Sequence, residues 1–121
     1  MYRTVRMTKG GSPFCFPEYI AGEMENLFAS VAQAQFFEGL SADDFALQAA
    51  NFLAELNAIH PFREGNGRTQ LSFVALLSVR TGHPLNVQRL VSSEFLAAMV
   101  ESFVGSKQPL AAQLRSLIDD E

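Results

Sequence analysis

The feature that most constrains the fold is a regular spacing of apolar residues that ends at a proline. The apolar positions are Phe45, Ala49, Phe52, Leu53, Leu56 and Ile59. They recur at the spacing that places side chains on one face of an α-helix. Ser41 is a good N-cap, and Asp44 mimics the acidic partner of a capping box. Pro61 disfavours helical geometry at His60, so we predict a helix that begins after Ser41 and stops at His60.

Further helices are predicted on both sides of this one. An earlier stripe with helical spacing contains Ile20, Met24, Leu27, Phe28 and Val31. Pro17 suits the first turn of that helix, where its missing N–H has no consequence. After the proline-containing loop, a third helix is predicted from about Arg68 to Thr81, with Gly82 as its C-terminal stop.

Two more helices are predicted near the C-terminus. Ser92 or Ser93 is expected to cap the fourth, which Gly105 ends. Pro109 is expected to open a short fifth helix. Its apolar residues are Leu110, Leu114, Leu117 and Ile118.

The N-terminal segment has a different pattern. From Tyr2 to Phe16, β-branched and aromatic residues flank Lys9-Gly10-Gly11, and glycine allows the positive φ angles of a tight hairpin turn. Two short strands are marginal in water, so this hairpin needs support from the helices. The predicted fold is therefore mainly α: one helical domain over residues 1–121 with an N-terminal β-hairpin.

Composition narrows the class of function. A length of 121 residues with 48% hydrophobic and 18% charged residues is typical of one ordered globular domain. The net charge of -4 argues against a nucleic-acid partner. No apolar stretch is long enough for a bilayer span, and the N-terminus lacks the apolar segment of a secretory signal. Cys15 is the single cysteine, and it is expected to be a buried, inert thiol in a reducing compartment.

The segment between the second and third helices concentrates polar chemistry. Gly65 and Gly67 let backbone N–H groups converge at the start of a helix, an arrangement that holds phosphates. Arg68 adds a charged fork for phosphate oxygens, and Glu64 beside an anion site makes sense if it holds Mg²⁺. His60 can accept a proton from a hydroxyl near neutral pH. We therefore expect the loop 61–67 to form an anion site at the N-terminus of the helix that starts near Arg68. A structure with Asn66 buried in a helix, or with those amides capped by side chains, would rule this site out.

These residues resemble a known family. Residues 60–68, HPFREGNGR, match every fixed position of the Fic signature, His-x-Phe-x-Asp/Glu-Gly-Asn-Gly-Arg, up to its first arginine. Residues 2–18 look like the Fic flap hairpin, and residues 82–85 also look like their family counterparts. The resemblance covers nearly the whole chain.

The resemblance implies transfer of AMP from MgATP to a Ser, Thr or Tyr hydroxyl of a target protein. His60 would deprotonate the hydroxyl, and Glu64 would hold Mg²⁺. The residues implied in nucleotide binding are Gly65, Asn66, Gly67 and Arg68. Phe62 is expected to point into the core and pin the loop.

The hairpin would pair an exposed strand edge with the target segment. The residues implied in target binding are Thr4, Val5, Arg6, Lys9, Gly10 and Gly11. From the residues alone, Arg3, Arg6 and Lys9 are equally compatible with a solvated strand face and with target contact. His83, unlike His60, is not surrounded in sequence by acidic, glycine and arginine residues at motif spacing, so we expect it in a surface turn.

One departure from the family pattern leaves alternatives open. Position 71 holds Leu71 where the signature ends in arginine, which keeps open a catalytically impaired nucleotide- or protein-binding module. A third hypothesis is transfer of another phosphate-containing group, as in the Doc branch, although Gly65-Asn66-Gly67 matches the AMP-transferring type.

The family's usual helices before the flap are not found at the start of this sequence. No inhibitory Ser/Thr-x-x-x-Glu-Gly/Asn segment is found either. These departures lead us to expect an inhibitory or completing chain, or self-association. Action in the cytoplasm, or in a host cytosol after delivery, is expected.

Overall fold

The computed structural model describes residues 1–9, 12–62 and 65–119. In chain order, the elements are β1 (Thr8–Lys9), β2 (Ser12–Pro13), η1 (Pro17–Tyr19), α1 (Ile20–Gln33), η2 (Gln35–Phe37), α2 (Ala42–Ile59), α3 (Asn66–Arg80), η3 (Val87–Arg89), α4 (Ser92–Val104) and α5 (Gln108–Ser116). The fold is mainly helical, as predicted from the apolar spacing.

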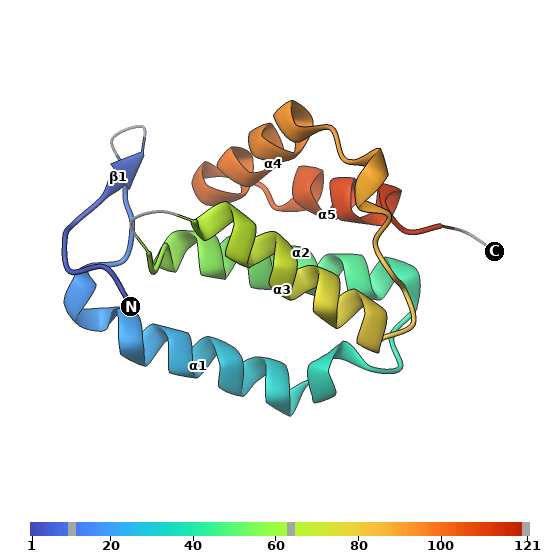
Figure 1. Ribbon diagram of the computed structural model, residues 1–121, viewed down its shortest axis with the longest axis horizontal. Helices are drawn as coiled ribbons and strands as arrows, with labels where there is room; N and C mark the ends of the chain where they lie inside the picture. The colour runs from blue at the N-terminus through green and yellow to red at the C-terminus, as the bar shows by residue number, and fades with distance from the viewer. Residues whose placement is uncertain (10–11, 63–64, 120–121) are drawn as a thin grey trace.

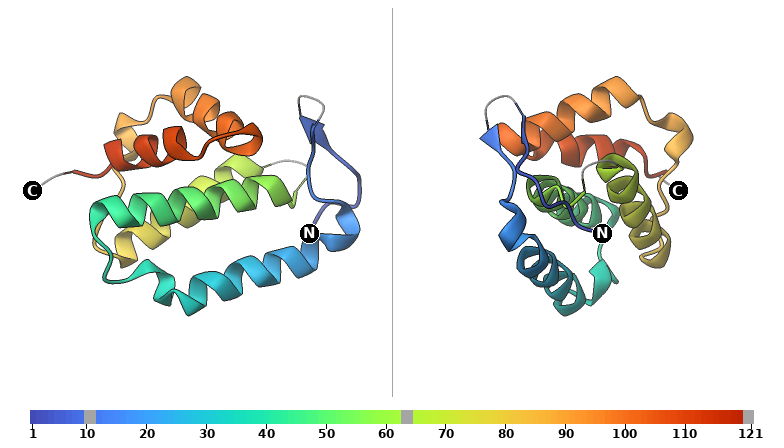
Figure 2. Two further views of the ribbon diagram at one scale, coloured as in Figure 1. Left: turned by 180° about the vertical axis from the view of Figure 1, so that it is seen from behind. Right: turned by 60° about the vertical axis from the view of Figure 1, so that its left-hand side comes forward.

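Helix α2 is the centre of the arrangement. It contacts α1, α3, α4 and α5. Helix α1 lies on one side of the α2–α3 pair, and α4 and α5 lie on the other (Figures 1 and 2). The short strands lie at the end of the molecule where α2 finishes and α3 begins, and the end of α5 lies towards the opposite end (Figure 1). The predicted motif is therefore located at one end of the helical bundle.

The predicted boundaries of α2 are confirmed. The Ser41 hydroxyl accepts a hydrogen bond from the Asp44 N–H at 3.1 Å, as a helix N-cap does. His60 is the C-cap of the helix. The apolar stripe between these ends is buried, and Phe45 and Leu53 are fully enclosed in the core. Burial of a stripe of this kind against several helices is the main stabilising contribution to such a fold.

The other helices agree with the prediction in place and differ at their ends. Helix α3 begins at Asn66 rather than near Arg68. Helix α4 has Val91 as N-cap without a side-chain cap, so the prediction that Ser92 or Ser93 caps it is wrong. Gly105 is the C-cap of α4, as predicted, and Pro109 lies in the first turn of α5.

Phe28 occupies the edge of the α1 stripe rather than its buried centre. Its side chain is 39% exposed. The ring lies 5.2 Å from the Phe73 ring and 6.4 Å from the Phe52 ring, between centroids. Phe28 therefore lies at the edge of the interface between α1 and the α2–α3 pair, where it packs against aromatic rings of both helices.

Strand pairing at the N-terminus is shorter than predicted. β1 and β2 pair antiparallel, with Thr8 opposite Pro13 and Lys9 opposite Ser12. The turn predicted at Gly10 and Gly11 lies outside the described residues. The extended hairpin flap predicted over residues 2–16 is not shown, because residues 2–7 and 14–16 take no part in a strand.

His83 lies directly after the turn that follows α3, in agreement with the prediction, but its side chain is only partly exposed. The side chain is half-buried, and its Nε2 lies 2.6 Å from the Leu40 carbonyl oxygen. The contact ties the turn after α3 to the segment before α2.

None of the helices in the described ranges has both the length and the apolar character required to cross a bilayer.

Candidate functional site

His60 leaves α2 through a left-handed backbone conformation. Its φ is 49° and its ψ is 63°, while its N–H still donates to the Leu56 carbonyl at 2.9 Å. A left-handed conformation costs a non-glycine residue about 1–2 kcal/mol. The His60 ring stacks on Phe14, with centroids 4.0 Å apart and an interplanar angle of 8°. The side chain therefore has a defined environment at the point where the helix ends.

The start of α3 provides backbone donors. Gly65 is its N-cap with a φ of 81°, a conformation that glycine adopts readily, and among the described residues no side-chain hydrogen bond caps the helix there. The first N–H groups of a helix lack intrahelical partners, and the helix dipole is positive at that end. This helix start is suited to an anion such as a phosphate group.

The expected position of Asn66 is wrong. Asn66 was expected in a loop ahead of the helix, but it is the first residue of α3 and is 6% exposed. Its Oδ1 accepts from the Phe62 N–H at 3.0 Å, and its Nδ2 donates to the Phe62 carbonyl at 2.5 Å. These bonds occupy the side-chain amide, so any contribution of Asn66 to an anion site comes from its backbone N–H. The anion site predicted in loop 61–67 is therefore ruled out in that form, because Asn66 is buried in a helix and its side chain caps the Phe62 N–H. The start of α3 remains as the candidate anion site.

A cavity of about 250 Å³ joins these features. Its wall includes His60 from the end of α2, and Asn66 and Gly67 from the start of α3. The remaining lining residues come mostly from α3 and α4 and are Phe14, Asn57, Gln70, Leu71, Ser92, Phe95, Leu96, Met99, Val100 and Phe103. A candidate proton acceptor and a candidate anion site thus share one cavity.

Leu71 faces this same cavity. It is half-buried and lies one helical turn after Gly67. The residue that departs from the Fic signature is therefore at the candidate site and not in the enclosed core.

Several cavity residues were not predicted from sequence. Gln70 is buried, and its Nε2 lies 3.4 Å from the Asn57 Oδ1. Phe14 both stacks on His60 and lines the cavity. Helical spacing could have brought Gln70 to attention, because it follows Asn66 by one turn. No sequence pattern near Phe14 predicts its place at the site. Phe14 lies there because the N-terminal segment folds back onto the end of α2.

Phe62 does not point fully into the core. It is half-buried, and its ring centroid lies 5.9 Å from that of Tyr2. The predicted pinning of the loop is instead visible in the two Asn66 hydrogen bonds.

Other predicted site residues lie outside the described part of the chain. These are Glu64, Gly10 and Gly11, together with the side chains of Lys9 and Arg68. Among the described residues, no group of three or more His, Cys, Asp or Glu side chains is placed to hold a metal ion.

Both predictions made for Arg3, a solvated strand face and a contact with the target, are wrong. Its side chain is 4% exposed, so it belongs neither to a solvated face nor to a surface that contacts a target. Thr4, Val5 and Arg6 are exposed, and the Arg6 guanidinium lies 4.5 Å from the Phe16 ring centroid. Target binding by these three residues remains a prediction.

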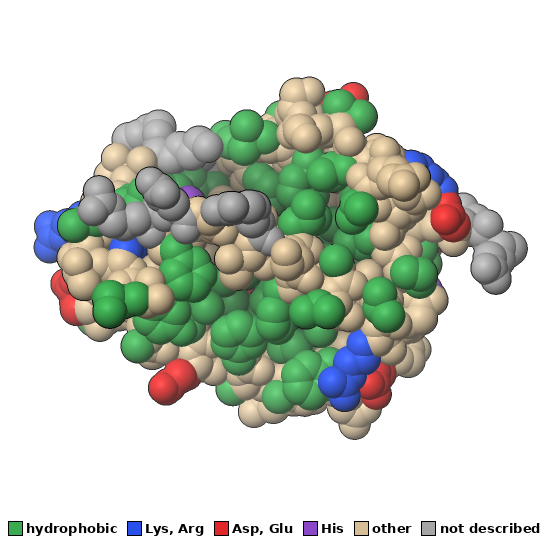
Figure 3. Space-filling view, viewed as in Figure 1, with side chains coloured by type: hydrophobic (Ala, Val, Ile, Leu, Met, Phe, Trp, Pro, Cys, Tyr) green, Lys and Arg blue, Asp and Glu red, His purple; other side chains and the backbone are tan. Residues whose placement is uncertain are grey.

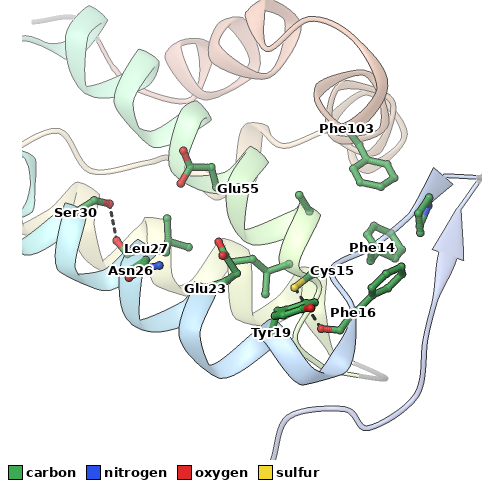
Figure 4. A pocket seen from close by; sticks show the side chains of 13 residues that line it. Phe14, Cys15, Phe16, Tyr19, Glu23, Asn26, Leu27, Ser30, Glu55 and Phe103 are labelled. Carbon is green, nitrogen blue, oxygen red and sulfur yellow. Dashed lines mark hydrogen bonds between the residues drawn. The ribbon is translucent and has the colours of Figure 1, made fainter.

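A larger groove of about 780 Å³ lies between α1 and α2. Figure 4 shows Phe14, Phe16, Tyr19 and Phe103 gathered at one end of it. The larger groove contains no described residue of the 60–68 motif, although Phe14 and Phe103 line both hollows. We therefore assign the candidate chemistry to the smaller cavity.

Cys15 lines the larger groove and is half-buried. Burial raises the pKa of its thiol, the carboxylate of Glu23 raises it further, and Arg3 lowers it. A raised pKa disfavours the reactive thiolate. The thiol is less buried than predicted, and its inertness remains a prediction.

Comparison with known proteins places this geometry in a family. The model of the Fic/DOC family matches residues 1–78. A probable protein adenylyltransferase from Sinorhizobium fredii, y4lH, is 48% identical over 117 residues, covering 96% of this chain and 61% of the relative. Protein adenylyltransferase VbhT from Bartonella schoenbuchensis is 34% identical over 113 residues, covering 93% of this chain and 24% of the relative. The chain thus spans about three fifths or less of these relatives.

Solved structures agree in fold. BepC from Bartonella tribocorum, solved with bound AMPPNP, has a TM-score of 0.89 at 28% identity, over 98% of this chain and 58% of that one. A Fic domain from Bartonella quintana, solved with bound ADP, has a TM-score of 0.89 at 26% identity, over 96% of this chain and 56% of that one. The helical frame, the motif at the α2–α3 junction and the family match lead to one conclusion: this chain belongs to the Fic/DOC family.

Proposed function

We propose that this chain transfers AMP from ATP to a hydroxyl group of a target protein. The observation that carries the proposal is the shared cavity, where His60 at the end of α2 meets the start of α3. The name of the relative y4lH, probable protein adenylyltransferase, supports this reaction. So do the nucleotides bound in the two structures of similar fold.

The reaction is an in-line displacement at the α-phosphorus. The target hydroxyl oxygen forms a bond to that phosphorus as the bond to the oxygen bridging to the β-phosphorus breaks. His60 accepts the hydroxyl proton, and pyrophosphate leaves. Removing the proton during attack is general-base catalysis, which contributes on the order of 10²–10⁴-fold in rate.

The start of α3 would hold the phosphates. Backbone N–H groups at Asn66 and Gly67 fit this role, because they lie at a helix N-terminus and line the cavity. Arg68 would neutralise the charge of the leaving pyrophosphate. Glu64 would hold Mg²⁺, whose chemistry is to screen the phosphate charge and orient the groups that react.

The N-terminal segment would hold the target. Thr4, Val5 and Arg6 are exposed beside the strand pair, and Gly10 and Gly11 fall in the predicted turn. An extended target segment placed along this edge would bring a hydroxyl towards His60 by backbone pairing.

Leu71 supports a second candidate function. It places an uncharged side chain on the cavity wall where the family signature has arginine. A nucleotide-binding module with slow or no transfer would follow if that charge is required for ATP placement.

The site of action is proposed to be a cytosol, where ATP is abundant. BepC from Bartonella tribocorum, whose fold is similar, is a VirB-translocated effector protein. A host cytosol is therefore a second proposed site of action. Fractionation of cells carrying the tagged protein would test this, and recovery outside any cytosolic fraction would contradict it.

Peptide mass spectrometry tests the proposed reaction. The chain is incubated with MgATP and a mixture of cellular proteins, and modified peptides are identified. We expect AMP adducts on Ser, Thr or Tyr. Compared with a reaction without the chain, an increase in phosphate adducts with no AMP adducts would contradict AMP transfer and support the Doc-type hypothesis.

A further inference from the structure

Arg3 lies far from the motif in sequence and directly behind it in the structure. It is 57 residues from His60, and its guanidinium group is buried beneath the end of α2. Arginine is rarely buried unless its donors are paired. The partners of these donors therefore indicate what Arg3 does.

Arg3 satisfies the carbonyl groups at the end of α2. Its Nη2 donates to the Ile59 carbonyl at 2.9 Å and its Nε to the His60 carbonyl at 2.5 Å. Its backbone N–H donates to the Pro61 carbonyl at 2.7 Å. The last carbonyl groups of a helix have no intrahelical partner and carry the negative end of the helix dipole. A buried cation with several donors is well suited to that position.

The same guanidinium group holds both sides of the N-terminal segment. Its Nη1 donates to the Val5 carbonyl at 2.7 Å, ahead of β1. Its Nη2 also donates to the Cys15 carbonyl at 2.5 Å, after β2. The Cys15 N–H donates to the Ala58 carbonyl of α2 at 2.9 Å. Arg3 thus joins the base of the strand pair to the helix that carries His60.

These bonds bear directly on His60. The Ile59 and His60 carbonyl groups flank the His60 Cα, so fixing both of them restrains its φ and ψ angles. Those angles are left-handed, a conformation that persists in a non-glycine residue when its surroundings enforce it. The ring stacks on Phe14, the neighbour of Cys15, which Arg3 also holds. Both the backbone and the stacking partner of His60 therefore depend on Arg3.

We propose that Arg3 is a positioning residue for His60. By restraining the His60 backbone and the Phe14 segment, Arg3 fixes the orientation of the imidazole ring. The same hydrogen bonds connect His60 to the strand pair that is proposed to hold the target. This inference rests on the proposed function for its catalytic consequence, whereas the geometric part can be measured without any transfer.

Lysine cannot replace this arrangement. Arginine offers five N–H donors in a rigid planar fork, whereas lysine offers three on one flexible nitrogen. Arg3→Lys retains the positive charge at the helix end and loses the geometry. The substitution therefore separates positioning from simple charge neutralisation.

Proton–carbon NMR of the histidine rings tests the geometric part. The chain has two histidines, His60 and His83, so a His83→Gln variant assigns both ring signals. The wild-type His60 signals should show the ring-current shift expected from stacking on Phe14. In Arg3→Lys and Arg3→Met, we expect the His60 signals to move towards the values of an unstacked ring while those of His83 stay in place.

Transfer kinetics test the catalytic consequence. We expect kcat in both Arg3 variants to fall by about 10- to 100-fold, the effect of misplacing a reacting group, with the KM for ATP changed less than threefold. Arg80→Lys and Arg80→Met are the matched controls, because exposed Arg80 pairs with Glu38 away from the cavity. The controls should leave the His60 signals and kcat unchanged.

Three outcomes would overturn the proposal. One is a folded Arg3→Lys variant with wild-type His60 signals. Another is a wild-type kcat in a variant whose melting temperature has fallen, which would indicate stability alone. The third is loss of the fold in both Arg3 variants, which would assign Arg3 to folding. If the wild-type chain transfers nothing, the proposed function fails, and the NMR result still decides the geometry.

Discussion

Two side chains on the wall of the smaller cavity differ in what the sequence predicts for them. His60 matches the family signature, whereas Leu71 departs from it. Leu71 is half-buried, so an arginine there has a cavity to enter and does not have to be placed in the enclosed core. An arginine at this position is therefore expected to be accommodated without loss of the fold.

We expect Leu71→Arg to increase AMP transfer. A hydrogen bond to a charged group contributes roughly 1.5–3 kcal/mol, which corresponds to about one to two orders of magnitude in ATP placement. ATP affinity and the transfer rate should both be measured, with the melting temperature checked in parallel. Leu76→Arg is the control, since Leu76 is exposed on the same helix and does not line the cavity. A folded Leu71→Arg variant that gains neither affinity nor rate would defeat the expectation.

Some site residues could be predicted from sequence because their positions follow from local geometry. His60, Gly67 and position 71 are brought together by one helix end and the first turns of the next helix. Arg3 and Phe14 could not be predicted in the same way, because their contacts depend on how the N-terminal segment folds back onto α2. The role of Asn66 was also missed, since its hydrogen bonds to Phe62 depend on the path of the intervening loop.

At the scale of elements, the junction between α2 and α3 is the decisive feature. The helices were predictable because their apolar spacing is long and regular. The predicted start of α3, near Arg68, came too late in the chain. Gly65 forms the N-cap with a positive φ, and the sequence pattern around it does not reveal that conformation. The strands were overestimated because a short segment rich in β-branched residues need not pair along its length.

Gly65→Ala should weaken nucleotide binding. A φ of 81° is unfavourable for alanine by about 1–2 kcal/mol, so the start of α3 and its free N–H groups should shift. Gly82→Ala is a matched control, because Gly82 has the same φ of 81° just after α3 and away from the cavity. Both variants should lose stability, and Gly65→Ala alone should lose affinity for an ATP analogue in calorimetry. Equal affinity in the two variants would contradict the anion site at the start of α3.

Ser41→Ala tests the cap at the other end of α2. Removing the hydroxyl that accepts from the Asp44 N–H should lower the unfolding free energy by about 1 kcal/mol, measured by urea denaturation. Ser93→Ala should change it by less than about 0.5 kcal/mol, because α4 has no side-chain cap. A comparable loss in both variants would mean that the two helix starts do not differ as described.

At the scale of the whole molecule, apolar side chains extend beyond the core. Figure 3 shows hydrophobic side chains gathered over the face that α1, α3 and α4 present. On α3, Leu76 is 71% exposed and Val79 is 68% exposed. Contiguous apolar surface of this kind is commonly buried against another protein surface.

We expect this face to promote self-association. Light scattering at high micromolar concentration should show a mean mass above 13.3 kDa, and Leu76→Glu with Val79→Glu should reduce it without loss of helicity. Leu47→Glu is the control, because Leu47 is an exposed leucine on α2. A strictly monomeric wild-type chain would contradict the expectation.

The central claim concerns the reaction at the α2–α3 junction, and ATP labelled at two positions tests it most directly. Separate reactions contain ATP labelled on the α-phosphate or on the γ-phosphate, with cellular proteins as acceptors. Wild-type chain and His60→Ala are compared, with His83→Ala as the control for loss of a histidine away from the cavity.

We predict that the wild-type and His83→Ala chains increase α-label incorporation into protein above a reaction without the chain, and leave γ-label incorporation at the level of that reaction. His60→Ala should retain affinity for the ATP analogue and incorporate the α label on the order of 10²–10⁴-fold more slowly, because it lacks the general base. Incorporation of the γ label above that of a matched reaction without the chain, or equal incorporation of the α label by His60→Ala and wild type, would contradict the account.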